Sequence, residues 1–242
     1  MLDSELMNTP NLCGKILEEM KTGVFAEAKR LPRETVLSEK MGVSRTQLRD
    51  ALTDLEREGF ISRRHGVGTI INRHVIDVKC RMDIETEFLD IIRANGYEAT
   101  ILDIEVSEEI ADKVQSEKLG IQEGDEIIRI KLLCGADGRP AIYCEDVLEK
   151  RLVKEEYKDQ VHEVIVFKFL KQFCKIEAYM DLTELHPAIA DEKLAEILQV
   201  PVGTLLMNME EVDYDIEGNA IFYSKQYFVD ELIHHTVLRK KF

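Results

Sequence analysis

The feature that most constrains this chain lies between Ser44 and Gly59, where a helix start, an apolar face and a helix stop follow one another. Ser44 is a favoured N-cap residue, and Gln47 three positions later completes a capping-box pattern. Apolar side chains then recur at i, i+3, i+4 and i+7, which indicates a helix with one face in a core. The other face of its first turn carries arginine and threonine, so the segment predicts an amphipathic helix with a basic start. The apolar positions are Leu48, Ala51, Leu52 and Leu55.

Two shorter helices are expected before this one. Thr9-Pro10 combines a hydroxyl cap with a proline at the first helical position, and apolar residues recur at helical spacing as far as Met20. A second helical pattern over 36–41 is followed by Gly42, which permits a tight turn. The order is helix, helix, tight turn and amphipathic helix, which is the arrangement of a helix-turn-helix.

A two-stranded wing is expected after Gly59. Residues 60–64 and 69–72 are rich in β-forming side chains, and the glycine-containing connection 65–68 is typical of a hairpin. In DNA-binding folds of this kind, a helix with arginines in its first turn enters the major groove. A glycine-rich wing lets backbone amides approach phosphate closely. The first part of the chain therefore predicts a winged helix-turn-helix.

The charge of the chain is divided unevenly. The net charge is −15, but residues 1–75 carry +1 and the remainder carries −16. Residues 40–75 contain 7 basic and 4 acidic side chains. Binding to DNA needs a locally basic surface rather than a basic protein, so the acidity of the distal part does not exclude nucleic acid. We expect the acidic part to weaken non-specific binding to DNA.

Five motifs in this region resemble, in order, the winged helix of the GntR family. They are LPRE at 31–34, GVSRT at 42–46, RDAL at 49–52, EGFI at 58–61 and GVGT at 66–69. The resemblance implies DNA-contact positions at Arg33, Ser44, Arg45, Thr46, Gln47, Arg49, Arg64, His65, Gly66 and Gly68. Arg33 stands where the family often has serine, and it adds a candidate phosphate contact. The alternative for Arg45 and Arg49 is a solvated helix face, and for His65 it is a wing tip in solvent.

The rest of the chain contains an internal repeat at an offset of about 80 residues. Residues 110–143 and 189–223 each show a helical pattern, a strand, a turn and a second strand. The repeat predicts one antiparallel sheet made from two copies around a pseudo-two-fold axis, with helices on one face. The cleft between the copies is the expected ligand pocket.

This distal part resembles the UTRA effector domain of the HutC subfamily, which has a chorismate-lyase-like fold. The landmarks are Leu119, Gly124, the hairpin 136–140 with Glu145, and Tyr223-Ser224. We therefore expect an α+β protein with a winged helix-turn-helix over 1–75 and an effector-binding and dimerisation domain over 83–242. Residues 76–82 are expected to form the linker, because no strong core pattern follows Asn72.

The same resemblance implies an effector site at Phe88, Leu132, Cys134, Glu145, Ile165, Phe167, Phe222 and Phe228. Family members that bind sugar phosphates place two arginines on the first hairpin strand, where this chain has Leu132 and Cys134. A buried phosphate dianion needs cationic and N–H partners. We therefore expect a less polar effector with a hydroxyl or amine that Glu145 accepts. The alternatives are that the aromatic residues are core and that Glu145 pairs with Arg129 or Lys131.

These features predict a sequence-specific DNA-binding transcription regulator, namely a repressor whose DNA affinity is modulated by a small-molecule effector. The expected partners are palindromic double-stranded operator DNA, the effector and a second copy of the chain in a homodimer. One alternative is a constitutive DNA-binding protein with a degenerate effector domain. The other is a lyase-like enzyme, since the fold resembles that of a lyase, but fold does not carry function.

Enzymatic activity is not expected, because no nucleophile or metal-ligand motif surrounds the histidines, including His234-His235. The 5 cysteines are scattered without CxxC spacing, which indicates a reduced, cytoplasmic protein without a metal or cofactor. Cys134 would act as a redox sensor only if the pKa of its thiol were depressed. No apolar stretch is long enough for a membrane span.

Overall fold

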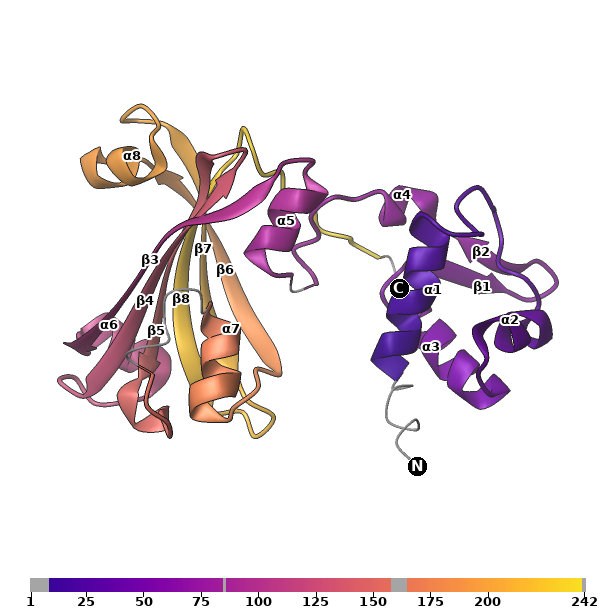
Figure 1. Ribbon diagram of the computed structural model, residues 1–242, viewed down its shortest axis with the longest axis horizontal. Helices are drawn as coiled ribbons and strands as arrows, with labels where there is room; N and C mark the ends of the chain where they lie inside the picture. Colours follow the sequence, from indigo (N-terminus) through magenta and orange to yellow (C-terminus); the bar gives the residue numbers. More distant parts are fainter. Residues whose placement is uncertain (1–8, 85, 158–164, 241–242) are drawn as a thin grey trace. The chain divides into compact units, whose positions relative to one another are not determined.

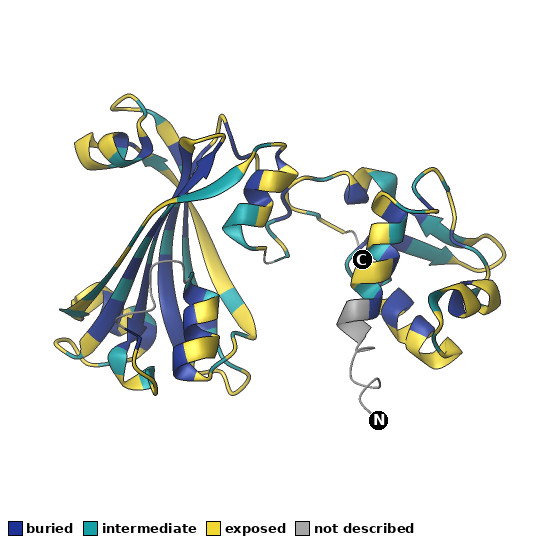
Figure 2. Cartoon of the chain, in the orientation of Figure 1, coloured by how far each residue is buried: buried dark blue, intermediate teal, exposed yellow. Residues whose placement is uncertain are grey.

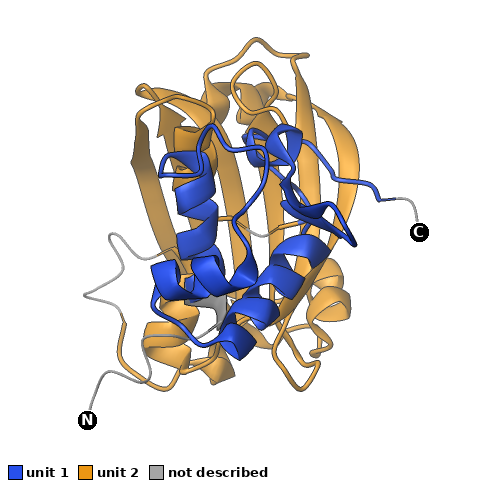
Figure 3. Ribbon diagram, turned by 90° about the vertical axis from the view of Figure 1, so that its right-hand side faces the viewer, with its two compact units in different colours: residues 1–83, 236–242 blue, residues 84–235 orange. Residues whose placement is uncertain are grey.

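The computed structural model describes residues 9–84, 86–157 and 165–240. The chain forms two compact units: unit 1 comprises residues 1–83 and 236–242, and unit 2 comprises residues 84–235 (Figure 3). Residues 236–240 are expected in the second domain from the sequence, whereas in the structure they group with the first unit. The chain therefore passes between the units twice.

Unit 1 is a helix-turn-helix followed by a wing and a short helix (Figure 1). Its elements are α1 (Thr9–Lys21), α2 (Glu34–Met41), α3 (Arg45–Arg57), β1 (Ile61–Arg64), β2 (Gly68–Ile71) and α4 (Arg73–Ile76). The apolar faces of the first three helices meet in one core, in which Ile16, Leu37 and Leu48 are fully buried. Strands β1 and β2 pair antiparallel, with Arg64 opposite Gly68. The expected order of elements is confirmed.

Local sequence signals set where these elements begin and end. Ser44 Oγ accepts a hydrogen bond from the Gln47 amide at 3.2 Å, and Gln47 Oε1 accepts one from the Ser44 amide at 3.1 Å. The predicted capping box is therefore formed. Gly42 follows α2 with a φ of +67°, a left-handed conformation that permits the tight turn without a steric penalty.

The segment after the wing packs more tightly than an unpatterned linker. Val75 and Ile76 of α4 are buried, and Ile76 belongs to the core of unit 1. Cys80 and Arg81 are also buried. These side chains form too short a run to give a periodic signal in the sequence, so their burial depends on tertiary contacts.

Unit 2 is an antiparallel sheet with helices. Its elements are α5 (Phe88–Ala94), β3 (Ala99–Ile110), α6 (Lys113–Leu119), β4 (Glu126–Ala136), β5 (Arg139–Glu149), η2 (Lys150–Leu152), α7 (Val166–Phe169), η3 (Leu170–Cys174), β6 (Met180–Ile189), α8 (Glu192–Leu198), β7 (Leu205–Tyr214) and β8 (Ala220–Val229). Within the described residues the sheet has 6 strands in the order β3-β4-β5-β8-β7-β6. The expected α+β class is confirmed.

The internal repeat forms the centre of this sheet. The repeated units are α6-β4-β5 and α8-β7-β8. They are joined in the sheet by the antiparallel pairing of β5 with β8. Both repeat helices start in the same way, because Asp112 accepts a hydrogen bond from the Gln115 amide and Asp191 accepts one from the Leu194 amide. The predicted sheet of two copies is therefore present.

Helices cover both faces of the sheet, so the expectation of helices on one face is wrong. On one face, here called the α7 face, Phe169 and Phe173 of α7 and η3 pack in a cluster with Ile130 of β4. On the other, the α6 face, Leu119 of α6 packs in a cluster with Tyr223 of β8. The second layer is built by α7, which lies outside the repeat and so escaped the repeat-based prediction.

Strand register assigns each central side chain to a face, since directly paired residues share one face and neighbours along a strand alternate. The α7 face carries Leu132, Cys134, Ile142, Cys144, Asp146, Ser224, Gln226 and Phe228. The α6 face carries Tyr143, Glu145, Val147, Tyr223, Lys225 and Tyr227. The central strands are largely buried and the edge strand β6 is largely exposed (Figure 2). Among the described helices, none combines the length and apolar character needed to cross a membrane.

Candidate functional site

The first turn of α3 presents an exposed polar surface on unit 1. Leu48 anchors the helix in the core, and the capping box fixes its first turn. Arg45 and Thr46 are exposed beside this cap. Arg49 follows one turn later, where its Nε lies 2.7 Å from Glu34 Oε2 and its side chain remains 62% exposed. This turn therefore combines backbone N–H groups, which the helix leaves without intrahelical partners, with arginine side chains.

The wing adds a second exposed segment from the same unit. Arg64, His65, Gly66 and Gly68 are all exposed. Gly66 and Gly68 have φ values of +75° and +97°, which a residue with a side chain adopts only with strain. The wing turn is closed by a hydrogen bond of 3.0 Å from the Val67 amide to the Arg64 carbonyl. Glycine thus shapes the wing tip.

Ion pairs distinguish arginines that hold the fold of unit 1 together from arginines that are free to contact a ligand. Arg63 is structural: its Nε lies 2.7 Å from Glu56 Oε2 and joins the wing to α3. Burial raises the pKa of Glu56, but the hydrogen bonds from Arg63 outweigh it and leave that pKa lowered. Among the described residues, no acidic side chain lies within 4.0 Å of the charged groups of Arg33, Arg45 or Arg64. These exposed cations suit a polyanion such as the DNA backbone.

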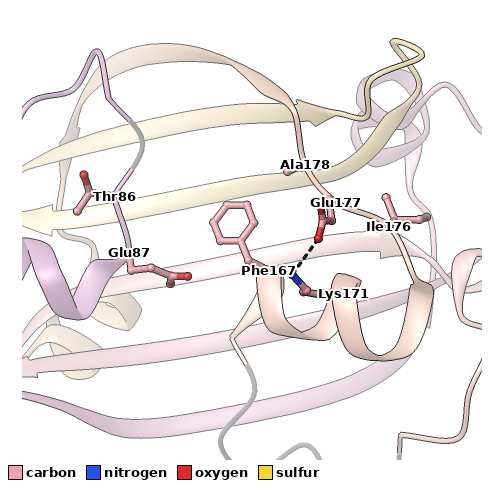
Figure 4. Close-up of a pocket in the computed structure, with 7 residues that line it drawn as sticks. All are labelled: Thr86, Glu87, Phe167, Lys171, Ile176, Glu177 and Ala178. Atoms are coloured by element: carbon pink, nitrogen blue, oxygen red, sulfur yellow. Dashed lines mark ion pairs between the residues drawn. The ribbon is translucent and has the colours of Figure 1, made fainter. Parts of the chain in front are cut away.

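Unit 2 contains a pocket of about 360 Å³ at the α7 side of the sheet (Figure 4). Its lining consists of Thr86, Glu87, Phe167, Lys171, Ile176, Glu177 and Ala178. The Lys171 Nζ forms an ion pair with Glu177 Oε1 at 2.9 Å. Burial raises the pKa of Glu87, although the charge of Lys168 partly opposes the shift. The pocket therefore combines an apolar wall with a carboxyl group that has been partly removed from water.

A buried polar network lies on the same face of the sheet. Asp146 Oδ1 accepts hydrogen bonds from Ser224 Oγ at 2.7 Å and from Cys144 Sγ at 3.0 Å. Burial raises the pKa of Asp146 to about 6, and the two hydrogen bonds only partly oppose the rise. Burial, with the nearby charges of Asp146 and Glu87, raises the pKa of the Cys134 thiol to about 12. The thiol is thus protonated near neutral pH, which argues against a redox-sensing role.

Two aromatic pairs border this region. Phe167 of α7 meets Phe222 edge-to-face at a centroid distance of 5.5 Å. Phe88 of α5 meets Phe228 in the same way at 6.0 Å, and the His235 ring lies 4.5 Å from Phe228. Phe222 and Phe228 are both 1% exposed. No group of three or more potential metal ligands is found in the described part of the chain.

Comparison with known families identifies both units. Residues 10–71 match the family described as bacterial regulatory proteins, gntR family, and residues 94–234 match the UTRA domain. The chain belongs to the GntR family of DNA-binding transcription regulators, with a UTRA domain. The matching families and curated relatives are transcription regulators, not enzymes.

Relatives of this GntR-family chain align along most of its length. An uncharacterised HTH-type transcriptional regulator, RB1450 of Rhizobium meliloti, is 25% identical over 232 residues, covering 92% of this chain and 91% of the relative. The histidine utilization repressor of Pseudomonas putida is 26% identical over 199 residues, covering 81% of this chain and 73% of the relative. The crystal structure of the possible transcriptional regulator YydK from Bacillus subtilis has a TM-score of 0.71 at 18% identity, covering 94% of this chain and 99% of that chain. The last similarity shows the fold.

The structure brings together some of the effector residues that the sequence implies. Leu132, Cys134, Phe222 and Phe228 lie buried on the α7 face. Phe88 and Phe167 are half-buried against that face, and Ile165, also half-buried, occupies the N-cap position of α7 without a capping hydrogen bond from its side chain. Of the predicted set, Phe167 lines the pocket itself. The full burial of Phe222 and Phe228 fits the alternative in which they serve as core residues.

Glu145 lies on the α6 face, away from the other candidate effector residues. Its Oε2 pairs with Arg129 Nη1 at 3.1 Å, and its Oε1 accepts a hydrogen bond from Tyr143 Oη at 2.7 Å. The ion pair across the hairpin, which is the alternative role expected for Glu145, is therefore present, and it lies on the face opposite the other candidate residues. The cause is the two-residue period of a strand, which turns neighbours to opposite faces.

Two acidic residues on the α7 side of the sheet, Glu87 of the pocket and the buried Asp146, are absent from the candidate set that the sequence implies. Glu87 directly precedes the predicted Phe88, and Asp146 directly follows the predicted Glu145. The alternation of strand side chains is the signal that separates Asp146 from Glu145. No comparable local pattern marks Glu87, because its position depends on how the segment before α5 meets α7.

Proposed function

We propose that this chain is a dimeric repressor whose affinity for a palindromic operator is changed by a small molecule bound in the pocket of unit 2. The observation that carries the DNA-binding part is the exposed arginine-bearing first turn of α3 beside a glycine wing. Arginine can bond guanine bidentately in the major groove. Helix N-termini and wing amides bind phosphate. Arg33, Arg45, Arg49 and Arg64 are the proposed contact cations.

Dimerisation follows from the geometry of this mode of binding. Helix-turn-helix proteins bind two half-sites through a two-fold dimer, so operator symmetry mirrors protein symmetry. The repressor role is supported by the relative named as the histidine utilization repressor. Effector binding then shifts DNA affinity only by its differential affinity for the two conformations of the dimer.

The pocket favours an effector that is not a phosphate. On the α7 face of the central parts of β4, β5 and β8, over residues 128–134, 142–148 and 222–228, no lysine or arginine occurs. The cation that lines the pocket, Lys171, is already paired with Glu177. A phosphate dianion entering here would lose water without gaining fixed cationic donors. We propose an apolar effector with a neutral or positively charged end.

Glu87 is the proposed partner of that polar end. Its carboxyl lines the pocket beside the apolar Phe167. Burial raises the pKa of Glu87 because the carboxylate loses contact with water. A cationic or hydrogen-bond-donating group of the effector would replace that lost interaction. A small amine with an aromatic or aliphatic body has the matching chemistry.

Thermal-shift measurements on the full-length chain test this proposal. The probes are matched sets of small amines, the corresponding alcohols and sugar phosphates. We expect amines to raise the unfolding temperature of the wild type and to lose that effect in Glu87→Gln. Glu145→Gln is the matched control, because it neutralises a carboxyl group on the α6 face and leaves the pocket unchanged.

Strong stabilisation by a sugar phosphate would refute the proposed effector chemistry. If no compound changes either the unfolding temperature or the affinity for DNA, the constitutive DNA-binding alternative replaces the effector-controlled one. That alternative rests on the complete burial of Phe222 and Phe228.

A further inference from the structure

The end of the chain returns to unit 1 after the last strand of unit 2. Residues 236–240, here called the tail, run beside the segment that follows α4, and Thr236 forms a parallel bridge with Arg81. The Thr236 amide donates to the Cys80 carbonyl at 3.0 Å, and the Met82 amide donates to the Thr236 carbonyl at 2.9 Å. The Leu238 amide donates to Asp83 Oδ1 at 3.3 Å. The tail is therefore bonded through its backbone rather than merely lying against the surface.

The tail ends at the C-terminus of α3. The last carbonyls of a helix have no intrahelical donors and carry the negative end of the helix dipole. Lys240 Nζ donates to the Glu56 carbonyl at 3.0 Å and also to the Arg57 carbonyl. Arg81 Nη1 donates to the next carbonyl, that of Glu58, at 2.7 Å. Two cations from separate segments thus cap the same helix end.

Gly59 explains how the tail comes so close. Its φ of +81° turns the chain out of α3 into the wing. A Cβ at this position would lie 2.5 Å from Leu238 Cδ2 and 3.2 Å from Lys240 Cε. The space that a side chain would occupy is therefore filled by the tail. The absence of a side chain at Gly59 serves both the turn and this contact.

Arg81 links the tail to residues 58–60, which connect α3 to the wing. Its guanidinium lies 5.0 Å from the centre of the Phe60 ring and is paired with the carboxylate of Asp83. Asp83 in turn accepts the Leu238 amide. The hydrogen bond from Arg81 lowers the pKa of Asp83, although burial partly opposes the shift. The capping cations therefore belong to one connected set of contacts.

We propose that the tail is a positioning element for the DNA-recognition helix, with Lys240 as its principal positioning residue. This inference rests on the proposed function, in which the first turn of α3 contacts DNA. The tail acts at the opposite end of the same helix and holds its last turn against the start of the wing. The effect on DNA binding is indirect, because the ammonium group of Lys240 donates its hydrogen bonds to the helix carbonyls rather than to DNA.

Three full-length variants separate positioning from simple charge. Lys240→Gln removes the capping ammonium, Lys240→Arg restores a cation, and Arg239→Gln removes the same charge from the neighbouring exposed position. Operator duplexes are first selected from a random pool with the wild-type protein. The dissociation constant is then measured by fluorescence anisotropy across a salt series, and amide hydrogen exchange is measured over 54–60.

We expect Lys240→Gln to weaken operator binding about two- to fivefold and to speed exchange in the last turn of α3 by a similar factor. Lys240→Arg should recover most of both effects, and Arg239→Gln should show neither. The salt dependence should be the same in Lys240→Gln and wild type, because no phosphate contact is lost.

Equal losses in Lys240→Gln and Arg239→Gln, with a reduced salt slope, would show a charge effect on DNA and overturn the positioning role. Unchanged exchange and unchanged affinity in Lys240→Gln would overturn it as well. A wild-type protein that selects no operator would refute the proposed function, while the exchange measurement would still report whether the tail holds the helix end.

Discussion

The buried carboxyl of Asp146 gives the sharpest prediction for unit 2. Asp146 is 2% exposed, and its described hydrogen-bond donors, Ser224 and Cys144, are neutral. Burial raises its pKa from 3.8 to about 6. The native state therefore keeps the proton in a pH range where the unfolded chain has released it. Stability is highest below pH 4 on this account, falls as the pH rises to about 6, and stays lower above it.

The magnitude follows from the width of that window. Each unit of pKa difference corresponds to about 1.4 kcal/mol, so the shift of Asp146 corresponds to about 3 kcal/mol of native stability. Asp146→Asn is neutral at every pH and keeps an oxygen that accepts the Ser224 hydroxyl. Relative to wild type, the variant should therefore gain about 3 kcal/mol in unfolding free energy between pH 4 and pH 7.5.

Urea unfolding at a series of pH values measures this difference. Far-ultraviolet circular dichroism and tyrosine fluorescence serve as the signals, since the chain has no tryptophan. Ser224→Ala provides a variant of opposite sign, because the loss of a donor to the carboxylate should raise the pKa of Asp146 further and steepen the decline. Parallel pH profiles for wild type and Asp146→Asn would refute the assignment of the buried charge.

Three further substitutions test other parts of the structure. Ser44→Ala removes the cap of α3 and should destabilise unit 1 by about 1 kcal/mol in thermal unfolding, whereas Ser44→Asp should preserve most of the stability. Phe169→Ala empties a fully buried position and should cost unit 2 about 3–5 kcal/mol in urea unfolding; a loss below 1 kcal/mol would contradict the packing described here. Arg45→Ala should weaken operator binding about tenfold without changing the unfolding temperature, and an unchanged affinity would exclude Arg45 from the interface.

The sequence predicts unit 1 well because its signals are local. The Ser44 capping box and the glycine at position 42 each act within a few residues, and both appear in the structure as expected. The repeat is a second strong signal, since it predicts one antiparallel sheet from two copies, which the structure joins by pairing β5 with β8. The wing follows from the short β-rich runs on either side of its glycine-containing turn.

The features that the sequence does not predict depend on contacts between residues far apart in the chain, or on which face of a strand a side chain occupies. A shift of one residue along β5 separates Glu145, in an ion pair on the α6 face, from Asp146, buried on the α7 face. Glu87 lines the pocket because the segment before α5 meets α7. Lys240 caps a helix that lies far from it in the chain, and no periodic pattern reports such a contact.

The most direct test of the account is an anisotropy titration of the full-length protein on a selected operator duplex, with and without an amine that stabilises unit 2. We expect saturable, competitor-resistant binding of one dimer per palindromic site, and a change in dissociation constant when the amine is present. The amine effect should disappear in Glu87→Gln and persist in Glu145→Gln. Binding that is insensitive to DNA sequence, or an amine effect that survives in Glu87→Gln, would contradict the account.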